Sequence, residues 1–356
     1  MMKAKTDTTA DIHKSASKEQ RRLQMADIAR LAGVSTSTVS RALSGSSLVN
    51  DETRQRIAEL ARSLKYSINI DARNLRLKQT RTIAVVVPFD SETRQHLSDP
   101  FFLGILGSLA DALTDRGFDM LLSRIDAEHL DNAAQIFDTG RVLGVILIGQ
   151  WRHHDQLNQL AARHVPIVVW GAQLPQQLYV TVGSDNVTGG QKATEHLLQS
   201  GRKRIAFFGD TQLPEVAQRY EGYCKALAQH GITLDEKLVV PASFIEEGGK
   251  LAVAELCSRK TSFDALFACS DLLAMTSINS LRENNYRVPD DVAVVGYDDI
   301  ELARYFHPPL TTVRQPMAQA GLALVDALLT LIEDGNSEAQ LLPTELMIRA
   351  SSVCIG

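Results

Sequence analysis

Cysteine is scarce in this 356-residue chain, and its four copies, Cys224, Cys257, Cys269 and Cys354, show no paired spacing. Neither a disulfide framework nor a zinc site is therefore expected, and the thiols should be reduced. No apolar run approaches the roughly 20 residues that span a bilayer, and the polar N-terminus lacks the hydrophobic core of a signal peptide. We expect a cytoplasmic protein without a membrane partner.

Recognisable catalytic motifs are also missing. The sequence contains no nucleophile elbow, no glycine-rich phosphate loop and no HExxH helix. His153 and His154 are adjacent, so their side chains diverge and are poorly placed to hold one metal ion. We therefore expect no catalytic residues, no metal and no cofactor, although residue types alone leave a Ser–His–Asp or Cys–His enzyme open as the alternative.

Positive charge is concentrated near the N-terminus. The whole chain has a formal net charge of −5, yet Lys18–Arg81 carries +7 and the residues after Arg81 carry −13. A basic segment attracts phosphates irrespective of sequence, whereas an acidic body is repelled by them. A solvated run of charge is the simpler explanation of such asymmetry, but this basic segment also contains a two-helix motif at Met25–Ser44.

Met25–Ser44 reads as two short helices joined by a tight turn. The first helix has apolar residues at Met25, Ile28, Ala29 and Ala32, the spacing of one buried stripe. Gly33 suits a left-handed helix end, and Ser35 is a good N-cap for the second helix. In the second helix Val39, Ala42 and Leu43 point inward. Its polar residues occupy the other faces, where they can meet a DNA groove: Thr36, Ser37, Thr38, Ser40 and Arg41.

A third helix is predicted over Asp51–Leu64, with Asn50 as its cap and with Ile57, Leu60, Ala61 and Leu64 as its buried stripe. An ordinary helical hairpin with a solvated Ser/Thr face is the alternative for the first two helices alone. The segments ADIARLAGVSTSTVSRALSG and VNDETRQRIAELARSLKYSIN, however, resemble the DNA-binding headpiece of the lactose/galactose repressor (LacI/GalR) family. The resemblance implies that the groove-facing residues above, with Asn50 and Thr53, contact DNA.

Ser67–Arg81 is a basic connector in which Asn69 can cap one or two helical turns. So short a helix is marginal in water, so we expect it to form only when a partner holds it. The segment is similar to the hinge helix of the family, in which a Leu, here Leu75, enters the minor groove beside Ala72. It departs from the family at Ile68, where many members have Pro. A simple linker is the alternative.

From Thr82 the sequence alternates between apolar strands and helices, which predicts an α/β fold with parallel sheets covered on both faces. The strands are TIAVVVPF, MLLS, GVILIG, PIVVWG, YVTVG, RIAFFGD, KLVVPA, DALFACSD and VAVVGYDD, and the helices are Phe102–Arg116, Asn186–Gln199, Ala217–Gln229, Gly248–Ser258 and Leu272–Asn284. So long a region favours two lobes with a ligand cleft between them. The family resembles periplasmic sugar-binding proteins in this respect, and its three crossings between lobes would fall near Thr181–Asp185, Gly296–Ile300 and Leu310–Gln315.

Ligands of open α/β sheets bind beyond the carboxyl ends of the strands, so the side chains at these ends are candidate ligand contacts. The resemblance implies that Arg219, at a helix start, and Asp298 bind sugar hydroxyls, and that Ser270 replaces a frequent Asn or Asp. Aromatic faces at the same ends can stack on a sugar, although core packing is the alternative for them. The candidate effector residues are Phe101, Phe102, Trp170, Arg219, Ser270, Asp298 and Met317; the neighbouring Asp271 and Asp299 are expected to be structural caps.

The sequence therefore predicts four parts: a flexible arm at 1–22, a helix-turn-helix domain at 23–66, a hinge at 67–81 and a two-lobed effector and dimerisation domain at 82–356. The resemblance implies a transcriptional repressor of carbohydrate-utilisation genes, controlled by a small sugar bound between the lobes. We expect it to bind a palindromic double-stranded operator as a homodimer, because two recognition helices related by a two-fold axis match two half-sites.

Overall fold

The computed structural model describes residues 24–43, 46, 48–64, 80–89, 96–245 and 247–353. It divides into two compact units, Met1–Gln79 and Thr80–Gly356. The division falls inside the predicted hinge. Asn69, Ala72 and Leu75, together with the predicted arm at 1–22, lie outside the described residues. No helix in the described ranges is long and apolar enough to cross a membrane.

The described residues of the first unit form three helices around one small core, as predicted. They are α1 (Met25–Ala32), α2 (Thr36–Leu43) and α3 (Asp51–Ser63). The apolar stripes of the three helices meet there, and the fully or almost fully buried members of this core are Ile28, Ala29, Val39, Ala42, Val49 and Ile57. Burying these stripes against one another stabilises helices that are too short to persist alone.

Local capping fixes where these helices begin and end. Gly33 adopts φ 66° at the end of α1, a left-handed conformation that a side chain would disfavour. The Ser35 Oγ accepts a hydrogen bond from the Thr38 backbone N–H at 3.1 Å, and the Asn50 Oδ1 accepts one from the Thr53 N–H at 2.8 Å. Both predicted N-caps are confirmed.

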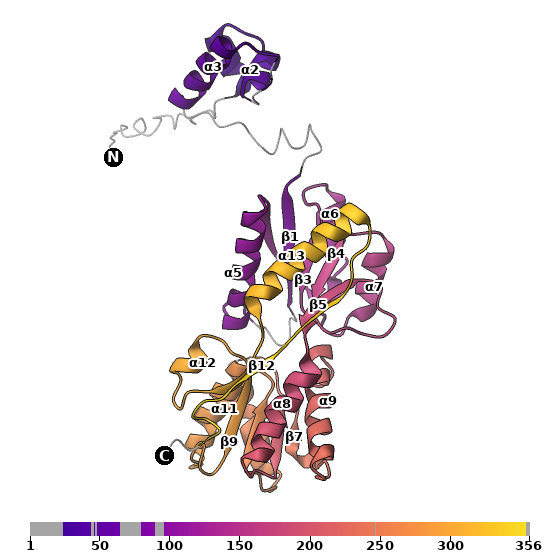
Figure 1. The fold of residues 1–356 in the computed structure, drawn as a ribbon, viewed down its shortest axis with the longest axis vertical. Coiled ribbons are helices and arrows are strands. Elements are labelled where there is room, and N and C mark those ends of the chain that lie inside the picture. Colours follow the sequence, from indigo (N-terminus) through magenta and orange to yellow (C-terminus); the bar gives the residue numbers. More distant parts are fainter. Residues whose placement is uncertain are drawn as a thin grey trace, which may run out of the picture. The chain divides into compact units, whose positions relative to one another are not determined.

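The second unit contains two lobes, each built on a six-stranded sheet (Figure 1). The sheet of the first lobe is parallel throughout, in the order β11, β5, β4, β3, β1, β2. Its elements are β1 (Thr82–Phe89), α5 (Pro100–Asp115), β2 (Asp119–Asp126), the 3-10 turn η1 (Ala127–His129), α6 (Asn132–Asp138), β3 (Val145–Ile148), α7 (His154–Ala162), β4 (Ile167–Trp170), β5 (Val180–Ser184), α13 (Met317–Asp334) and β11 (Gln340–Leu342).

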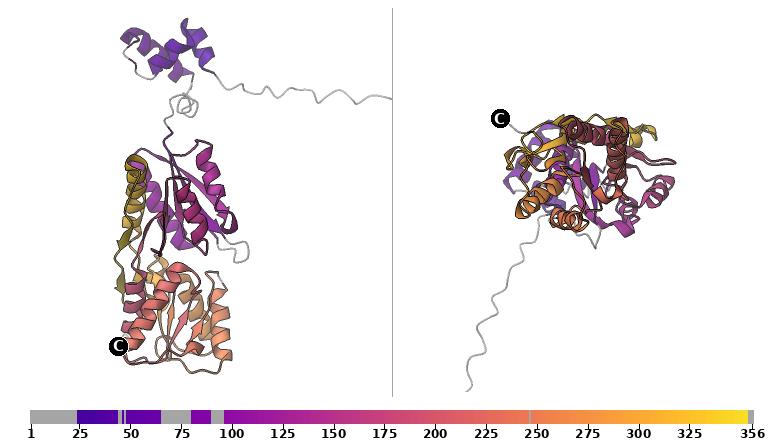
Figure 2. Two further views of the ribbon diagram at one scale, coloured as in Figure 1. Left: turned by 90° about the vertical axis from the view of Figure 1, so that its right-hand side faces the viewer. Right: turned by 90° about the horizontal axis from the view of Figure 1, so that it is seen from below.

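Helices cover both faces of this sheet, which is why its central strands are continuously apolar. Along β1, Ile83, Val85 and Val87 pack with α5 and α13, whereas Ala84 and Val86 pack with α6 and α7. The side chains of a strand alternate between its faces, so one buried strand serves two separate cores. Figure 2 shows α13 along the outside of this lobe and the C-terminal segment passing from it to the second lobe.

The sheet of the second lobe has the order β12, β10, β9, β8, β6, β7, and its edge strand β12 is antiparallel to β10. A wholly parallel sheet was expected, so this edge is a correction. The elements are α8 (Asn186–Gln199), β6 (Ile205–Phe208), α9 (Pro214–Gln229), the 3-10 turn η2 (Glu236–Leu238), β7 (Val239–Val240), α10 (Gly248–Ser258), β8 (Ala265–Ala268), α11 (Asp271–Glu283), β9 (Ala293–Asp298), α12 (Leu302–Tyr305), β10 (Thr311–Arg314) and β12 (Glu345–Met347).

The chain crosses between the lobes where β5 leads to α8, where β10 leads to α13 and where β11 leads to β12. The first two crossings agree with the predictions near Thr181–Asp185 and Leu310–Gln315. The remaining predicted crossing, Gly296–Ile300, is wrong. That segment is the end of β9, which pairs with β8 and β10 and so stays within the second lobe. The true third crossing is at residues 343–344, between two strands of only three residues each.

Two glycines allow α8 and α9 to pack closely. A Cβ on Gly222 of α9 would lie 2.1 Å from the Val187 carbonyl oxygen, and one on Gly190 of α8 would lie 2.1 Å from the Arg219 carbonyl oxygen. Both are backbone contacts, so relief requires the helices to separate. This contact matters for the site because Arg219 extends from the same part of α9.

We predict that Gly222→Ala destabilises the second unit by about 1–3 kcal/mol, because the added methyl group forces these helices apart. The matched control is Gly107→Ala, since nothing lies within 4 Å of a Cβ at this position in α5. The control should be stabilised by about 0.5–1 kcal/mol through helix propensity. Urea unfolding of both variants measures the difference. Equal changes in stability would show that the contact at Gly222 does not limit how closely α8 and α9 pack.

Candidate functional site

The polar face of α2 is accessible in the first unit. Thr36, Ser37 and Arg41 are exposed, while Ser40 is half-buried. Thr38 is also half-buried, and its hydroxyl lies 2.8 Å from the Ser35 Oγ in the capping arrangement. The helix therefore presents two short hydroxyl groups at its start and a guanidinium group further along. Such groups can contact phosphates or base edges at close range.

Asn50 and Thr53 lie together at the beginning of α3. The Asn50 side-chain oxygen is used to cap the helix, and the Thr53 N–H is the group that it caps. The structure thus gives both residues a local structural role. The Asn50 side-chain amide is a donor in addition to this bond, so their predicted contact with DNA stays a prediction.

A cavity of about 460 Å³ lies between the two lobes, and residues at the carboxyl ends of strands from both sheets line it. Six of the seven predicted effector residues line it: Phe101, Phe102, Trp170, Arg219, Ser270 and Asp298. The seventh, Met317, lines a neighbouring groove of about 860 Å³, which shares Phe101 and Asp298 with the cavity. Looking beyond the carboxyl ends of the strands therefore identified residues that do line one cavity. The exception is Met317, which begins α13.

Arg219 is almost fully buried, at 6% exposure, and is held from three directions. Its Nε donates to the Asn186 Oδ1 at 2.8 Å, and a terminal nitrogen donates to the Cys269 carbonyl oxygen at 2.5 Å. Its guanidinium carbon lies 3.8 Å from the centre of the Tyr297 ring, a cation–π contact. Arg219 lies in the second turn of α9, not at the helix start as predicted, because the helix begins earlier, at Pro214.

Asp298 ends β9 with φ 119°, a backbone conformation that is costly for a residue with a side chain. Its Oδ1 accepts a hydrogen bond from the Gln315 Nε2 at 2.7 Å. Burial raises the pKa of Asp298 to about 7, against the opposing effect of the nearby Arg219 charge. A carboxyl group with this pKa can either donate or accept a hydrogen bond near neutral pH.

The neighbouring aspartates are structural, but not as helix caps. The Asp271 carboxylate accepts from the Ile300 N–H at 2.8 Å and from the Thr312 Oγ1 at 2.5 Å, and burial raises its pKa. The cap of α11 is instead Ser270, whose Oγ accepts from the Leu273 N–H at 3.2 Å. Asp299 pairs with Arg314 at 2.7 Å and with Arg349 at 2.5 Å.

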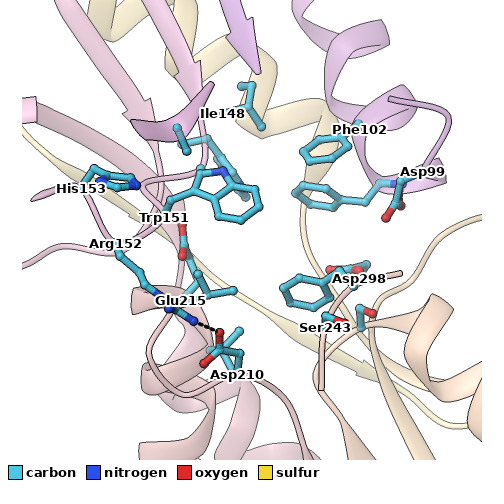
Figure 3. Close-up of a pocket in the computed structure, with 18 of the residues that line it drawn as sticks. Asp99, Phe102, Ile148, Trp151, Arg152, His153, Asp210, Glu215, Ser243 and Asp298 are labelled. Atoms are coloured by element: carbon cyan, nitrogen blue, oxygen red, sulfur yellow. Dashed lines mark hydrogen bonds and ion pairs between the residues drawn. The ribbon is translucent and has the colours of Figure 1, made fainter. Parts of the chain in front are cut away.

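The sequence reasoning missed several cavity residues that Figure 3 shows around the same space. Trp151 and Arg152 follow β3, Asp210 follows β6, and Glu215 lies in the first turn of α9; all of them line the cavity. The signal was available, since Trp151, Arg152 and Asp210 lie just beyond strand ends. Trp151 adopts φ 49°, which the sequence does not signal.

Arg152 and Asp210 also join the two lobes across the cavity. Arg152 of the first lobe pairs with Asp210 of the second at 2.5 Å, as Figure 3 shows. The Gln218 Nε2 donates to the Gln173 carbonyl oxygen at 3.3 Å. Burial raises the pKa of Glu215, a shift that hydrogen bonds from the Glu215 and Gln150 backbone N–H groups oppose. The contacts that hold the lobes together thus adjoin the space where a ligand would lie.

A helix-turn-helix unit followed by two α/β lobes around a polar and aromatic cavity defines a ligand-binding DNA regulator. Residues 24–69 match the family model for bacterial regulatory proteins of the lacI family, and residues 194–352 match that of a periplasmic binding protein-like domain.

Relatives with known names cover nearly the whole chain. It is 36% identical over 340 residues to the HTH-type transcriptional regulator CelR of Thermobifida fusca, covering 93% of this chain and 99% of that protein. It is 32% identical over 325 residues to the ribose operon repressor of Haemophilus influenzae, covering 90% and 95%.

Two solved structures extend the likeness to three dimensions. A CelR–cellobiose complex matches with a TM-score of 0.70 at 34% identity, covering 93% of this chain and all of that one. The lac repressor dimer bound to operator and the anti-inducer ONPF matches with a TM-score of 0.81 at 25% identity, covering 94% and 100%. The chain belongs to the LacI family of DNA-binding transcriptional regulators.

The raised pKa of Asp298 predicts a specific dependence of stability on pH. A carboxyl group whose pKa is raised by folding stabilises the folded state when protonated, and this contribution is lost as the pH rises through about 7. Asp298→Asn should therefore gain stability relative to the natural protein as the pH rises from about 5 to about 8, by on the order of 1–3 kcal/mol.

The control for this prediction is Asp291→Asn. Hydrogen bonds from Arg287 lower the pKa of Asp291 to about 2, so its contribution changes only in more acidic solution. Urea unfolding at several pH values measures both variants. A constant stability difference between Asp298→Asn and the natural protein over this range would show that Asp298 is not held protonated by burial.

Proposed function

We propose that this protein is a transcriptional repressor of carbohydrate-utilisation genes whose operator affinity is controlled by a sugar bound between the two lobes. The observation that supports this most directly is the cavity, in which aromatic and polar side chains from both lobes surround one space. Its volume of about 460 Å³ is within the usual range for small-molecule sites.

The cavity residues suit a polyhydroxylated ligand. Phe101, Phe102 and Trp170 offer apolar faces against which the C–H groups of a sugar ring can pack. Arg219 and Asp298 supply a fixed donor fork and a carboxyl group that can form paired hydrogen bonds with hydroxyl groups. Among relatives, CelR was solved with cellobiose and another is a ribose operon repressor, which supports a sugar as the effector here.

We propose that the protein acts in the cytoplasm as a homodimer on a palindromic operator. In this proposal α2 enters the major groove, so that Thr36, Ser37, Ser40 and Arg41 reach bases or phosphates, with Thr38, Asn50 and Thr53 beside them. Asn69, Ala72 and Leu75 would form a hinge in the minor groove. The dimeric, operator-bound lac repressor structure supports this arrangement.

Control by the effector follows from the contacts between the lobes. A ligand that binds one arrangement of the lobes more tightly than another shifts the population toward it. Two pairs that join the lobes lie beside the proposed ligand, Arg152 with Asp210 and Gln218 with Gln173. A ligand that changes how far the lobes close therefore moves the first lobe relative to the second. The chain leads from the first lobe to the hinge.

The proposed function is tested by measuring operator DNA binding and ligand binding with the same preparation. The protein should protect a palindromic site from nuclease, and a panel of monosaccharides and disaccharides should contain one that raises its unfolding temperature and changes that protection. We also propose that no sugar is turned over. Consumption of a stabilising sugar would favour an enzyme, and protection unaffected by every stabilising sugar would refute effector control.

Arg41→Ala should relax preference at one base pair of each half-site, with a loss of about 1–3 kcal/mol on the preferred operator. Arg41 is exposed on the polar face of α2, where a guanidinium group can bind guanine. The control is Arg62→Ala in α3, because Arg62 is exposed on a different helix. Binding to a set of single-base operator variants measures the effect, and equal loss on every variant would exclude base recognition by Arg41.

Arg219→Lys should greatly weaken sugar binding and the effector response while leaving operator binding intact. The Lys retains the positive charge but loses the planar fork that binds two hydroxyl groups at once. Arg204→Lys is the control, since Arg204 pairs with Asp235 and does not line the cavity. Sugar titration with circular dichroism as a check of folding measures the difference. An unchanged sugar affinity would remove Arg219 from the binding site.

A further inference from the structure

The cavity between the lobes is acidic as well as aromatic. Its lining includes six carboxyl groups, from Asp99, Asp126, Glu128, Asp210, Glu215 and Asp298, but only two guanidinium groups, from Arg152 and Arg219. The other basic group is the His153 imidazole, and no lysine is among the described residues that line the cavity. Burial raises the pKa of Asp298 and of Glu215, which favours their neutral forms. The other four carboxylates still outnumber the two guanidinium groups, so a ligand that enters this space meets more negative than positive charge.

Both guanidinium groups already donate to protein groups, which leaves only some of their N–H donors for a ligand. Arg152 pairs with Asp210 at 2.5 Å, so its charge is largely balanced. Arg219 donates to Asn186 and to the Cys269 carbonyl oxygen, and its charge opposes the burial that raises the pKa of Asp298. Neither residue resembles the clusters of uncommitted Arg or Lys that bind a phosphate or a carboxylate.

The carboxylates, in contrast, keep capacity for further hydrogen bonds. Asp126, for example, accepts a backbone N–H from Glu128 at 3.0 Å. A carboxylate has about four acceptor positions, so such groups can accept O–H donors from a ligand while they remain structural. Hydroxyl groups of a neutral saccharide are suitable donors. A phosphate or carboxylate on the ligand would instead add acceptors and a like charge.

We infer that the effector is an uncharged saccharide and that the acidic lining excludes phosphorylated and acidic sugars. This inference rests on the proposed function, since it specifies the ligand of the same cavity. Asp126 and Glu128 of the first lobe are the groups most open to this test, because both line the cavity and Asp126 accepts a backbone N–H from Glu128. The nearest basic group to Glu128 in the described part of the chain is the His153 imidazole, 3.9 Å away. Asp126 and Glu128 select ligands by charge, whereas the aromatic residues provide apolar contact area for neutral and anionic sugars alike.

The inference is tested by isothermal titration of the full-length protein with matched pairs of ligands. The pairs are cellobiose with cellobionic acid, glucose with glucose 6-phosphate, and ribose with ribose 5-phosphate. In each pair that binds, the neutral member should bind at least about tenfold more tightly, and the ratio should fall as salt is added. An anionic member that binds as tightly as its neutral partner overturns the inference but leaves sugar control intact. Binding by no member of any pair overturns the sugar effector itself.

A double variant, Asp126→Asn with Glu128→Gln, separates charge from shape. It removes two negative charges, while the new side-chain amide at position 126 retains an oxygen that can accept the hydrogen bond now accepted by Asp126. The ratio of the affinity for the neutral ligand to that for its anionic partner should fall several-fold, mainly because the anion binds more tightly. The matched control, Asp138→Asn with Glu333→Gln, removes two charges outside the cavity and should leave the ratio unchanged. Equal ratios in both double variants overturn the electrostatic basis of the selectivity.

Discussion

The candidate site depends on one buried cation, the guanidinium group of Arg219. Burying a charge is costly unless its hydrogen bonds are satisfied and an opposite charge is near. Here Asn186, the Cys269 carbonyl oxygen and the Tyr297 ring surround the group. These partners come from the start of α8, the end of β8 and β9, so one side chain ties together the segments that form the second lobe's side of the cavity.

The rest of the site is arranged around that cation. Asp298 lies next to it in a strained backbone conformation, with Gln315 as its hydrogen-bond partner at the second crossing between the lobes. Arg152 reaches from the first lobe to Asp210 of the second at 2.5 Å. Ligand-binding groups and groups that hold the lobes together are therefore neighbours. A ligand that exchanges hydrogen bonds with this set changes the balance between lobe arrangements without any separate transmitting element.

Sequence reasoning predicted the elements with strong local signals. The helices at Asn186–Gln199 and Gly248–Ser258 have the predicted bounds, and Ser35 and Asn50 cap helices as expected. The start of α9 was placed too late because Pro214, a favourable first residue of a helix, was not used as a signal. The third crossing was missed because β11 and β12 have only three residues each and none of these residues is buried, so they lack the apolar pattern of a core strand. Trp151 and Arg152 could have been found from their place just beyond β3, whereas the φ of 49° that Trp151 adopts has no signal in the sequence.

The central claim is that the cavity and the operator-binding unit are coupled, and reciprocity provides its most direct measurement. The dissociation constant of a stabilising neutral sugar is measured by isothermal titration with the free protein and again with protein saturated with operator DNA. If the two sites are coupled, the sugar affinity changes by the same factor by which the sugar changes the operator affinity, because linkage is symmetric. Identical sugar affinities in the two titrations would contradict the account.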